Sequence, residues 1–430
     1  MSLHQWPYYL DLELRSAIPR PDGPVPLRIN GPALLKAAGA SGHLDFRSLR
    51  LGDRNLFYGH WGSDTVERDV AVQFVPDEGF DPVHHPEGTL WFHLYKYSWE
   101  DKAFPRSFRL YFDTLSGGGK PAWSGGAQPF RPIPTMTEQV PGSLEWSRAG
   151  EPALGFRSPW SGKPHFHPVT TPSGQILTAD RPRDHLWHHG ICFGWTHVSC
   201  VAKELKDYAF WGEPGGAVIH TREDGLRVAG PVISAFRSDS ICCTQEGEPV
   251  FDMSLIGRYQ SIDQGWDWLD IELTLAARDE PVLFSSQYGH IKARLSLEFR
   301  EPVVLDSSGQ SEKDNPNREP NEVEWIGLSG QLAKGPAAML LLNHPGNPGG
   351  LPSGDGAVCR RGEFPIDEGA LFAWIGLNPM RKKPIALEPG APMTWRYRIV
   401  TTDRLLGMEF CKYQYDNWIT PWEIAGLPTR

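Results

Sequence analysis

Apolar and polar residues alternate along several stretches of the chain, and this alternation predicts β-strands. Between 269 and 275, Leu and Ile alternate with Asp, Glu and Thr, and the same period of two recurs over 291–300 and 393–399. Shorter alternating runs cover 90–95 and 108–113. A period of two places successive side chains on opposite faces of a strand, so each run predicts a sheet with one apolar and one polar face. Helical periodicity is nearly absent, and the predicted fold class is therefore all-β.

The predicted strands fall into two groups separated by a segment rich in glycine and proline. Residues 1–115 predict a small β domain with one helix over 32–38, which begins at a proline and ends before Gly39. Residues 116–140 include the run Ser-Gly-Gly-Gly-Lys-Pro and predict an unstructured linker. Residues 141–430 contain the longest alternating runs and predict a large sandwich of stacked antiparallel sheets.

Composition and charge limit the partners of this chain. It has 430 residues with 45 glycines and 39 prolines, which suits many turns between short strands. The net charge is −10 and there is no basic run, so we expect neither nucleic acid nor an anionic membrane as a partner. No apolar run approaches the roughly 18–20 residues that a membrane span needs.

Cysteine use and the N-terminal residues predict a cytoplasmic location. The six cysteines are few and irregularly spaced, which is typical of reduced thiols. The first residues lack the charged and then apolar pattern of a signal peptide, although secretion stays open if a leader has been removed. The chain has no Gly-x-Ser-x-Gly elbow and no glycine-rich dinucleotide fingerprint, so a serine hydrolase or a nicotinamide dehydrogenase is not predicted.

Polar and aromatic residues concentrate between 163 and 213, where prolines and glycines predict turns and short strands. Imidazole rings titrate near neutral pH, and a neighbouring carboxylate can fix their tautomer. We predict that His188 is a general acid or base and that Asp184 orients it. His290 or Glu213 is the predicted catalytic partner. The predicted substrate contacts are Lys163, His165, His167, Arg183, His185, Trp187, Trp211, Asn343 and His344.

Two other interpretations of these residues stay open. The turn around Asp184 could be a hydrogen-bonded structural element, and His290 could be a core residue at the start of its strand. Alternatively, His185, His188 and His189 could be ligands of a divalent metal ion, together with nearby carboxylate or imidazole groups. The leading interpretation requires no cofactor.

Several motifs, in this order along the chain, resemble those of a known family. They are Lys163-Pro-His-Phe-His-Pro168, Asp184-His-Leu-Trp-His-His-Gly190, Phe210-Trp-Gly-Glu213, Gly289-His290, Asn343-His-Pro-Gly-Asn-Pro348 and Gly376-Leu-Asn-Pro379. The set, within 145–402, resembles the bacterial family labelled methane oxygenase PmoA. This resemblance implies a galactose-mutarotase-like β supersandwich and a role in sugar degradation, without assigning a reaction. Residues 1–115 resemble the accessory modules of carbohydrate-active proteins, which implies a jelly-roll-like β-sandwich.

The chain departs from that family pattern at positions that bear on catalysis. Leu186, Trp187 and His189 replace a Pro, a His and an Arg, and Gln287-Tyr288 replaces a Lys-Glu pair. We predict a carbohydrate-active enzyme that acts on a sugar or oligosaccharide, including acidic ones, by acid/base chemistry as a glycoside hydrolase, lyase or epimerase. The alternatives are a metal-dependent oxygenase that uses the histidine cluster and a non-catalytic sugar-binding protein, which the missing Lys-Glu pair would favour.

Overall fold

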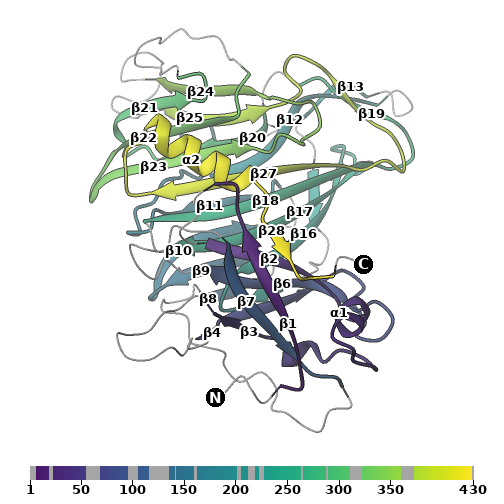
Figure 1. Cartoon of the computed structure of the whole chain (residues 1–430). Coiled ribbons are helices and arrows are strands. Elements are labelled where there is room, and N and C mark those ends of the chain that lie inside the picture. Colours follow the sequence, from purple (N-terminus) through teal and green to yellow (C-terminus); the bar gives the residue numbers. More distant parts are fainter. Residues whose placement is uncertain are drawn as a thin grey trace. The chain divides into compact units, whose positions relative to one another are not determined.

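The computed structural model (Figure 1) is nearly all β. It describes residues 6–18, 23–54, 68–94, 105–115, 135–140, 142–158, 162–200, 205–211, 218–221, 227–262, 265–286, 289–309, 322–359 and 372–428. Within them lie two α-helices, α1 (Gly31–Ala37) and α2 (Met408–Ile419), and a single 3-10 turn, η2 (Phe46–Ser48). Neither α-helix in this part of the chain has the length and apolar composition that a membrane crossing requires. The predicted all-β fold class is confirmed.

The chain divides into two compact units. The first contains Met1–Ile133, Val228–Ile233 and Thr420–Arg430, and the second contains Pro134–Arg227 and Ser234–Ile419. The sequence-based domains, 1–115 and 141–430 with a linker over 116–140, stay a prediction. Most of that linker lies outside the described residues.

The first unit is a β-sandwich, as predicted. One sheet has the order β28-β1-β7-β3-β4 and the other the order β2-β6-β5. Leu51 and Leu110 from the first sheet share one core with Leu27 and Leu90 from the second. Its strands are β1 (Tyr8–Arg15), β2 (Gly23–Asn30), β3 (Arg50–Asp53), β4 (Arg68–Val70), β5 (Val72–Pro76), β6 (Glu87–Leu94), β7 (Arg106–Phe112) and β28 (Glu423–Ala425).

The predicted helix over 32–38 is found as α1. The side chain of Asn30 accepts a hydrogen bond from the backbone N–H of Ala33 at 2.9 Å, which caps the first turn. At the other end of the chain, β28 pairs with β1, so that Leu14 lies opposite Ile424. The first unit is therefore completed by residues from the end of the sequence.

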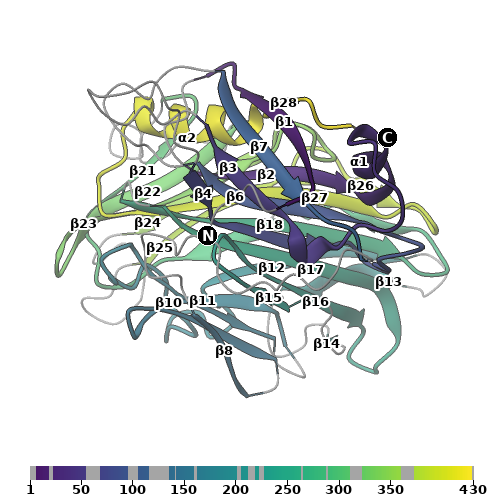
Figure 2. The ribbon, with the colours of Figure 1, turned by 60° about the horizontal axis from the view of Figure 1, so that its bottom comes forward.

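The second unit is a larger sandwich of two antiparallel sheets. One sheet has the order β24-β25-β20-β12-β11-β10-β9-β8, with β13, β19 and β26 attached, and the other has the order β14-β16-β17-β18-β27-β23-β22-β21. Figure 2 shows β8, β10 and β11 in one layer and β16, β17 and β18 in another. Phe193 and Ile291 from the first sheet and Leu273 and Trp395 from the second belong to one apolar core.

The strands of the first of these sheets are β8 (Thr135–Val140), β9 (Ser143–Arg148), β10 (Glu151–Arg157), β11 (His165–Val169), β12 (Ile191–Cys200), β13 (Leu205–Phe210), β19 (Val282–Phe284), β20 (Gly289–Arg294), β24 (Ser353–Cys359), β25 (Phe372–Asn378) and β26 (Ile385–Leu387). Those of the second are β14 (Val218–Thr221), β16 (Ser234–Cys243), β17 (Pro249–Ile262), β18 (Trp266–Ala277), β21 (Arg300–Asp306), β22 (Trp325–Leu332), β23 (Gly335–Asn343) and β27 (Met393–Thr402). The short strand β15 (Arg227–Ala229) lies where the chain passes from the second unit to the first.

Helix α2 covers the outer face of the second sheet (Figure 1). Cys411 and Tyr415 of the helix pack with Trp266 and Trp268 of β18 in a separate apolar cluster. The indole of Trp268 also donates a hydrogen bond to Gln414 at 2.9 Å. Helix α2 therefore covers part of this sheet on the side away from the core, whereas the polar groups of the candidate site lie on the other sheet.

One predicted strand is shorter in the structure. The alternation over 291–300 continues past the end of β20 at Arg294, and the chain turns before β21 begins at Arg300. Leu295 forms an isolated bridge with Thr178, and Leu297 is exposed. Alternation alone cannot mark this end, because the turn keeps apolar residues at alternate positions.

Candidate functional site

Part of the first sheet of the second unit has polar side chains on the face opposite the core. In its central strands, Cys192 of β12 pairs with His165 of β11 on one side and with Lys292 of β20 on the other. The neighbouring pair, Ile191 and Ala293, belongs to the apolar core. Since side chains alternate along a strand, His165 and Lys292 lie on the opposite face, and both are buried there.

The segment 179–190 folds over this face as a closed turn. The backbone N–H of Arg181 donates to the carbonyl of His188 at 2.8 Å, and that of Gly190 donates to Ala179 at 2.9 Å. Gly190 has a φ of 28°, and a Cβ at this position would lie 2.0 Å from the carbonyl oxygen of Phe166. Only glycine fits so close to β11, and this contact fixes the turn against the sheet.

The turn places four polar side chains together, and we name Asp184, His185, His188 and Arg294 the His185–His188 cluster. Nδ1 of His185 lies 2.8 Å from Oδ2 of Asp184. Arg294 on β20 forms an ion pair with the same carboxylate, with Nη2 2.8 Å from Oδ2, and both side chains are almost fully buried. The rings of His185 and His188 stack with centroids 4.6 Å apart. Asp184 thus orients His185, whereas we predicted that it would orient His188.

The His188 ring is buried and its environment keeps it neutral. Burial is the largest cause, and the charges of His185, Arg294, Lys292 and Lys163 add to it, so that the pKa of His188 is lowered to about 2. A neutral imidazole at pH 7 can donate one hydrogen bond and accept another. It is poorly suited to hold a proton as an acid, which limits the role that we predicted for it.

Two buried lysines and three tryptophans adjoin the cluster. Nζ of Lys163 donates to the carbonyl oxygens of Trp187 at 2.5 Å and Trp211 at 2.6 Å. Nζ of Lys292 lies 3.6 Å from the ring centroid of Trp374 and 5.2 Å from that of Trp211. The site therefore combines cationic groups with indole rings. Trp187, Trp211 and Trp374, which provide these rings, are half-buried.

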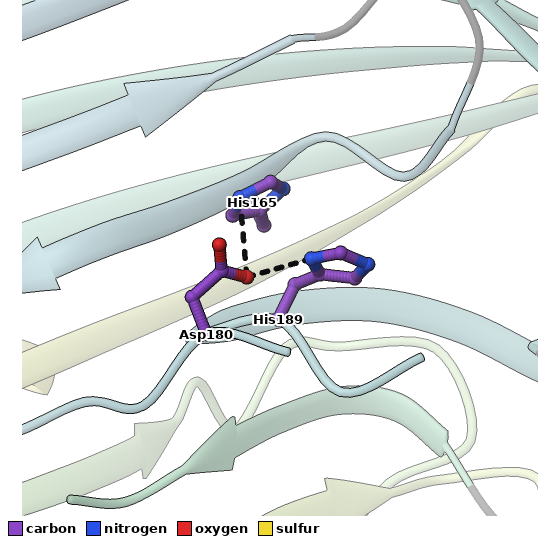
Figure 3. A group of neighbouring side chains, drawn as sticks. All are labelled: His165, Asp180 and His189. Carbon is purple, nitrogen blue, oxygen red and sulfur yellow. Dashed lines mark hydrogen bonds and ion pairs between the residues drawn. The ribbon is translucent and has the colours of Figure 1, made fainter. Parts of the chain in front are cut away.

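A second polar group lies beside the cluster and consists of His165, Asp180 and His189, the His165–Asp180–His189 triad (Figure 3). Oδ1 of Asp180 is 2.7 Å from Nδ1 of His189 and 3.8 Å from Nε2 of His165. The centroids of the two imidazole rings are 4.6 Å apart. Burial lowers the pKa of His165 to about 4. Burial alone would raise the pKa of Asp180, but the hydrogen bond from His189 and the charges of the neighbouring histidines lower it.

The predicted metal ligands are divided between these two groups. His185 and His188 are in the first, and His189 is in the triad. Among the described residues, the group with the spacing of metal ligands is the triad, in which one ligand atom from each residue lies within 4.8 Å of the others. Of the other predicted contacts on this stretch, His167 binds Thr178 through Nδ1 at 2.9 Å, and Arg183 is exposed on the turn.

His290 lies apart from both groups, inside the core of the second unit. By its register it should share a face with Lys292 and Arg294, but its φ is 71°, which is outside the strand region. The ring contacts Trp395 with centroids 4.9 Å apart, and Nδ1 accepts a hydrogen bond from the indole N–H of Trp195 at 3.1 Å. The structure does not bring His290 to His188, and its surroundings are those of a core histidine.

Asn343 and His344 also lie apart, at the end of β23. The amide of Asn347 donates to Asn343 at 2.8 Å and to the carbonyl of Arg396 at 2.8 Å, so the loop is held by its own hydrogen bonds. The ring of His344 packs against Trp418 of α2. Glu213 and the pair Gln287-Tyr288 lie outside the described residues.

Three residues of the site were given no role from the sequence: Lys292, Arg294 and Asp180. Lys292 and Arg294 occupy the polar positions of a strand whose apolar positions we identified. If we had assumed that the polar face of this sheet is also buried, we would have placed Lys292 and Arg294 in the candidate site. Asp180 lies at the start of the turn and belongs to no motif, so no comparable signal marks it.

The comparisons with known proteins concern the family and the fold. The model of a family of unknown function, DUF6807, matches residues 144–411. The predicted resemblance to the methane oxygenase PmoA family is therefore wrong, because nothing in the matches points to that family. No curated protein sequence matches the chain.

Two solved structures are similar at low levels. One is the GalM/aldose epimerase homologue from C. elegans, with 12% identity and a TM-score of 0.29 over 62% of this chain and 96% of that chain. The other is a TPR-domain containing protein from Parabacteroides distasonis, with 12% identity and a TM-score of 0.20 over 65% of this chain and 54% of that chain. The first is a protein of the predicted galactose-mutarotase-like class, but at these TM-scores neither carries an argument about function.

Proposed function

The chain belongs to DUF6807, a family of unknown function, and we propose from the chemistry of its site that it acts on an acidic sugar or oligosaccharide by acid/base catalysis at the His185–His188 cluster. The observation that carries this proposal is the hydrogen bond between Asp184 and Nδ1 of His185, next to buried cationic side chains. An imidazole held by a carboxylate is the usual arrangement of a general base.

His185 is the proposed catalytic residue. A carboxylate accepts hydrogen bonds, so Nδ1 of His185 carries the hydrogen, and Nε2 has the lone pair with which the neutral ring would accept a proton. The side chain of His185 is 25% exposed, so part of the ring is open to solvent. Arg294 neutralises Asp184 and fixes its position. His188, stacked on His185 and neutral, would bind a hydroxyl group of the substrate.

The cationic groups favour a substrate that bears a carboxylate. Lys163 and Lys292 are both buried, and each lowers the pKa of His188 by its charge, whereas the charge of Arg294 is balanced by Asp184. A positive potential of this kind attracts an anion and stabilises negative charge that develops in a transition state. If the base removes a proton from the carbon beside a carboxylate, these groups would stabilise the resulting enolate. Elimination by a lyase or epimerisation at that carbon thus fits this site better than hydrolysis.

The indole rings favour a sugar over a smaller acid. Trp187 lies at the edge of the cluster, with its ring centroid 5.1 Å from that of His185, and it is half-buried. An aromatic ring offers an apolar surface with a polar edge, which suits the C–H face of a pyranose. The proposed substrate is therefore a uronate or an oligosaccharide that contains one.

The test compares uronate-containing and neutral oligosaccharides as substrates of the full chain, with product formation followed by mass spectrometry. We expect turnover of an acidic substrate that falls at least 100-fold in His185→Ala, the lower end of the usual contribution of general acid–base catalysis. His197→Ala, at a half-buried position of β12, is the matched control and should keep wild-type turnover. Wild-type turnover in His185→Ala with intact folding would refute the role of His185. Binding of an acidic oligosaccharide that is recovered unaltered would support the non-catalytic alternative instead.

A further inference from the structure

The His165–Asp180–His189 triad has a feature that the proposed acid/base chemistry does not use. Nδ1 of His165 lies 2.8 Å from the carbonyl oxygen of Lys163. A carbonyl oxygen only accepts, so Nδ1 carries the hydrogen of the neutral ring and Nε2 is left with a lone pair. Nε2 lies 3.8 Å from Oδ1 of Asp180, which is also an acceptor. Two acceptors thus face each other across a short gap, as they do where a cation is bound between them.

The third member of the triad completes a set of metal ligands. His189 approaches the same oxygen of Asp180 from another direction, as Figure 3 shows. With metal–ligand bonds of about 2.1 Å and tetrahedral angles, two ligand atoms would lie about 3.4 Å apart. The two measured separations, 2.7 Å and 3.8 Å, lie on either side of this value, so small side-chain movements would suffice. The hydrogen of His189 would move from Nδ1 to Nε2 if the metal bound at Nδ1.

We propose that the His165–Asp180–His189 triad binds one divalent transition-metal ion. Two imidazole nitrogens and one carboxylate oxygen suit zinc, iron, cobalt or nickel, whereas magnesium and calcium prefer oxygen ligands alone. The hydrogen bond from His165 to Lys163 is the outer support that metal-binding histidines commonly have. The two imidazole side chains are 8% exposed and that of Asp180 is 31% exposed, so an ion would approach from the side of the carboxylate. Three protein ligands leave at least one position for water or a substrate oxygen.

This proposal is independent of the sugar chemistry, although the two sites are adjacent. His188 and His189 are neighbours in the sequence. Lys163 accepts a hydrogen bond from His165 through its backbone carbonyl, and its side chain donates to the carbonyl of Trp187, next to His188. A metal at the triad would add positive charge next to the His185–His188 cluster. It would not take part in the hydrogen bond that holds His185.

The test measures zinc and cobalt binding to the full chain after removal of metal with a chelator. We expect one zinc ion per chain by calorimetry. Asp180→Asn and His165→Ala should each lose more than about 100-fold in affinity, because loss of a ligand should cost more than loss of an outer hydrogen-bond partner, which costs about 10- to 100-fold. Asp180→Asn changes one atom of the side chain and should preserve folding. His167→Ala is the control on the same strand, because its ring binds Thr178 and lies outside the triad, so it should keep wild-type affinity.

A second measurement needs no variant. Cobalt bound by nitrogen ligands at a coordination number below six gives an intense visible absorption band, whereas fully hydrated cobalt absorbs weakly. The absence of zinc uptake and of this band in the wild-type chain would overturn the proposal, as would unchanged affinity in both triad variants. His185→Ala separates the two sites, because it should lower sugar turnover at least 100-fold and leave the metal affinity unchanged.

Discussion

Replacement of His290 by asparagine should make the second unit less sensitive to acid. The His290 ring is completely buried, and burial lowers its pKa from 6.5 to about 3. Its Nε2 is buried and has no hydrogen-bond partner among the described residues. A proton could therefore be added to this ring only at a high cost in free energy. Asparagine does not titrate, tolerates a positive φ and can accept the hydrogen bond from Trp195.

The magnitude follows from the two pKa values of His290. Above pH 6.5 the ring is neutral in both the folded and the unfolded chain, so it contributes nothing to the pH dependence. As the pH falls from 6.5 towards 3, the unfolded chain takes up a proton that the folded chain does not, and the free energy of unfolding decreases. The decrease is about 1.4 kcal/mol per pH unit, which gives about 2 kcal/mol between pH 7 and pH 5.

The assay is urea unfolding of wild type and variant at pH 7 and pH 5, analysed for the transition of the second unit because two units can unfold separately. Other buried histidines contribute equally to both proteins, so the difference in pH sensitivity isolates His290. We expect the wild type to lose about 2 kcal/mol more than His290→Asn between the two pH values. His197→Asn serves as the control and should behave as the wild type. Equal losses in wild type and His290→Asn would refute the reasoning.

Three further substitutions test the packing around the site and in the first unit. Asp184→Asn should lower the free energy of unfolding by about 3–5 kcal/mol, because it removes the carboxylate that balances the buried charge of Arg294. In urea unfolding, the double variant Asp184→Asn with Arg294→Met should recover part of this loss. Gly190→Ala should lower the free energy of unfolding by about 1–3 kcal/mol, because its Cβ would overlap the carbonyl of Phe166. The measurement is the melting temperature, and an unchanged value would mean that the turn is not held against β11 at this point. Asn30→Ala should cost about 1 kcal/mol through loss of the α1 cap, and Asn30→Asp should restore it; equal stability of all three proteins would contradict the assigned cap.

The sequence was sufficient to predict several of the strands, because their alternation is a local property. The runs at 269–275 and 393–399 lie within β18 and β27, where one face is turned to the core over the whole length of the strand. The end of β20 at Arg294 was missed, because Leu295 continues the apolar pattern into a turn. Pattern alone therefore indicates where a strand lies better than where it ends.

The candidate site was predictable only in the part that is continuous in sequence. Asp184, His185 and His188 belong to one turn and were identified together. Arg294 follows Asp184 by 110 positions, and only the pairing of β12 with β20 brings it to the carboxylate. His290 was predicted to be a catalytic partner of His188, but it lies in the core. Its positive φ directs the side chain away from the polar face on which its strand position would place it. Such reversals depend on a single dihedral angle and leave no trace in the pattern of residues.

The pairing of β28 with β1 has a consequence for biosynthesis. As the chain leaves the ribosome, β1 is made before the second unit, but its neighbour on one side, Glu423–Ala425, is made after it. Until then the backbone N–H and C=O groups of Glu13–Arg15 on that edge lack the strand that later pairs with them, and an open edge invites pairing with other chains. A fragment that stops at residue 133 would keep this edge permanently open. We therefore expect it to be less soluble than the intact chain, and an added peptide that spans residues 420–430 should improve its recovery.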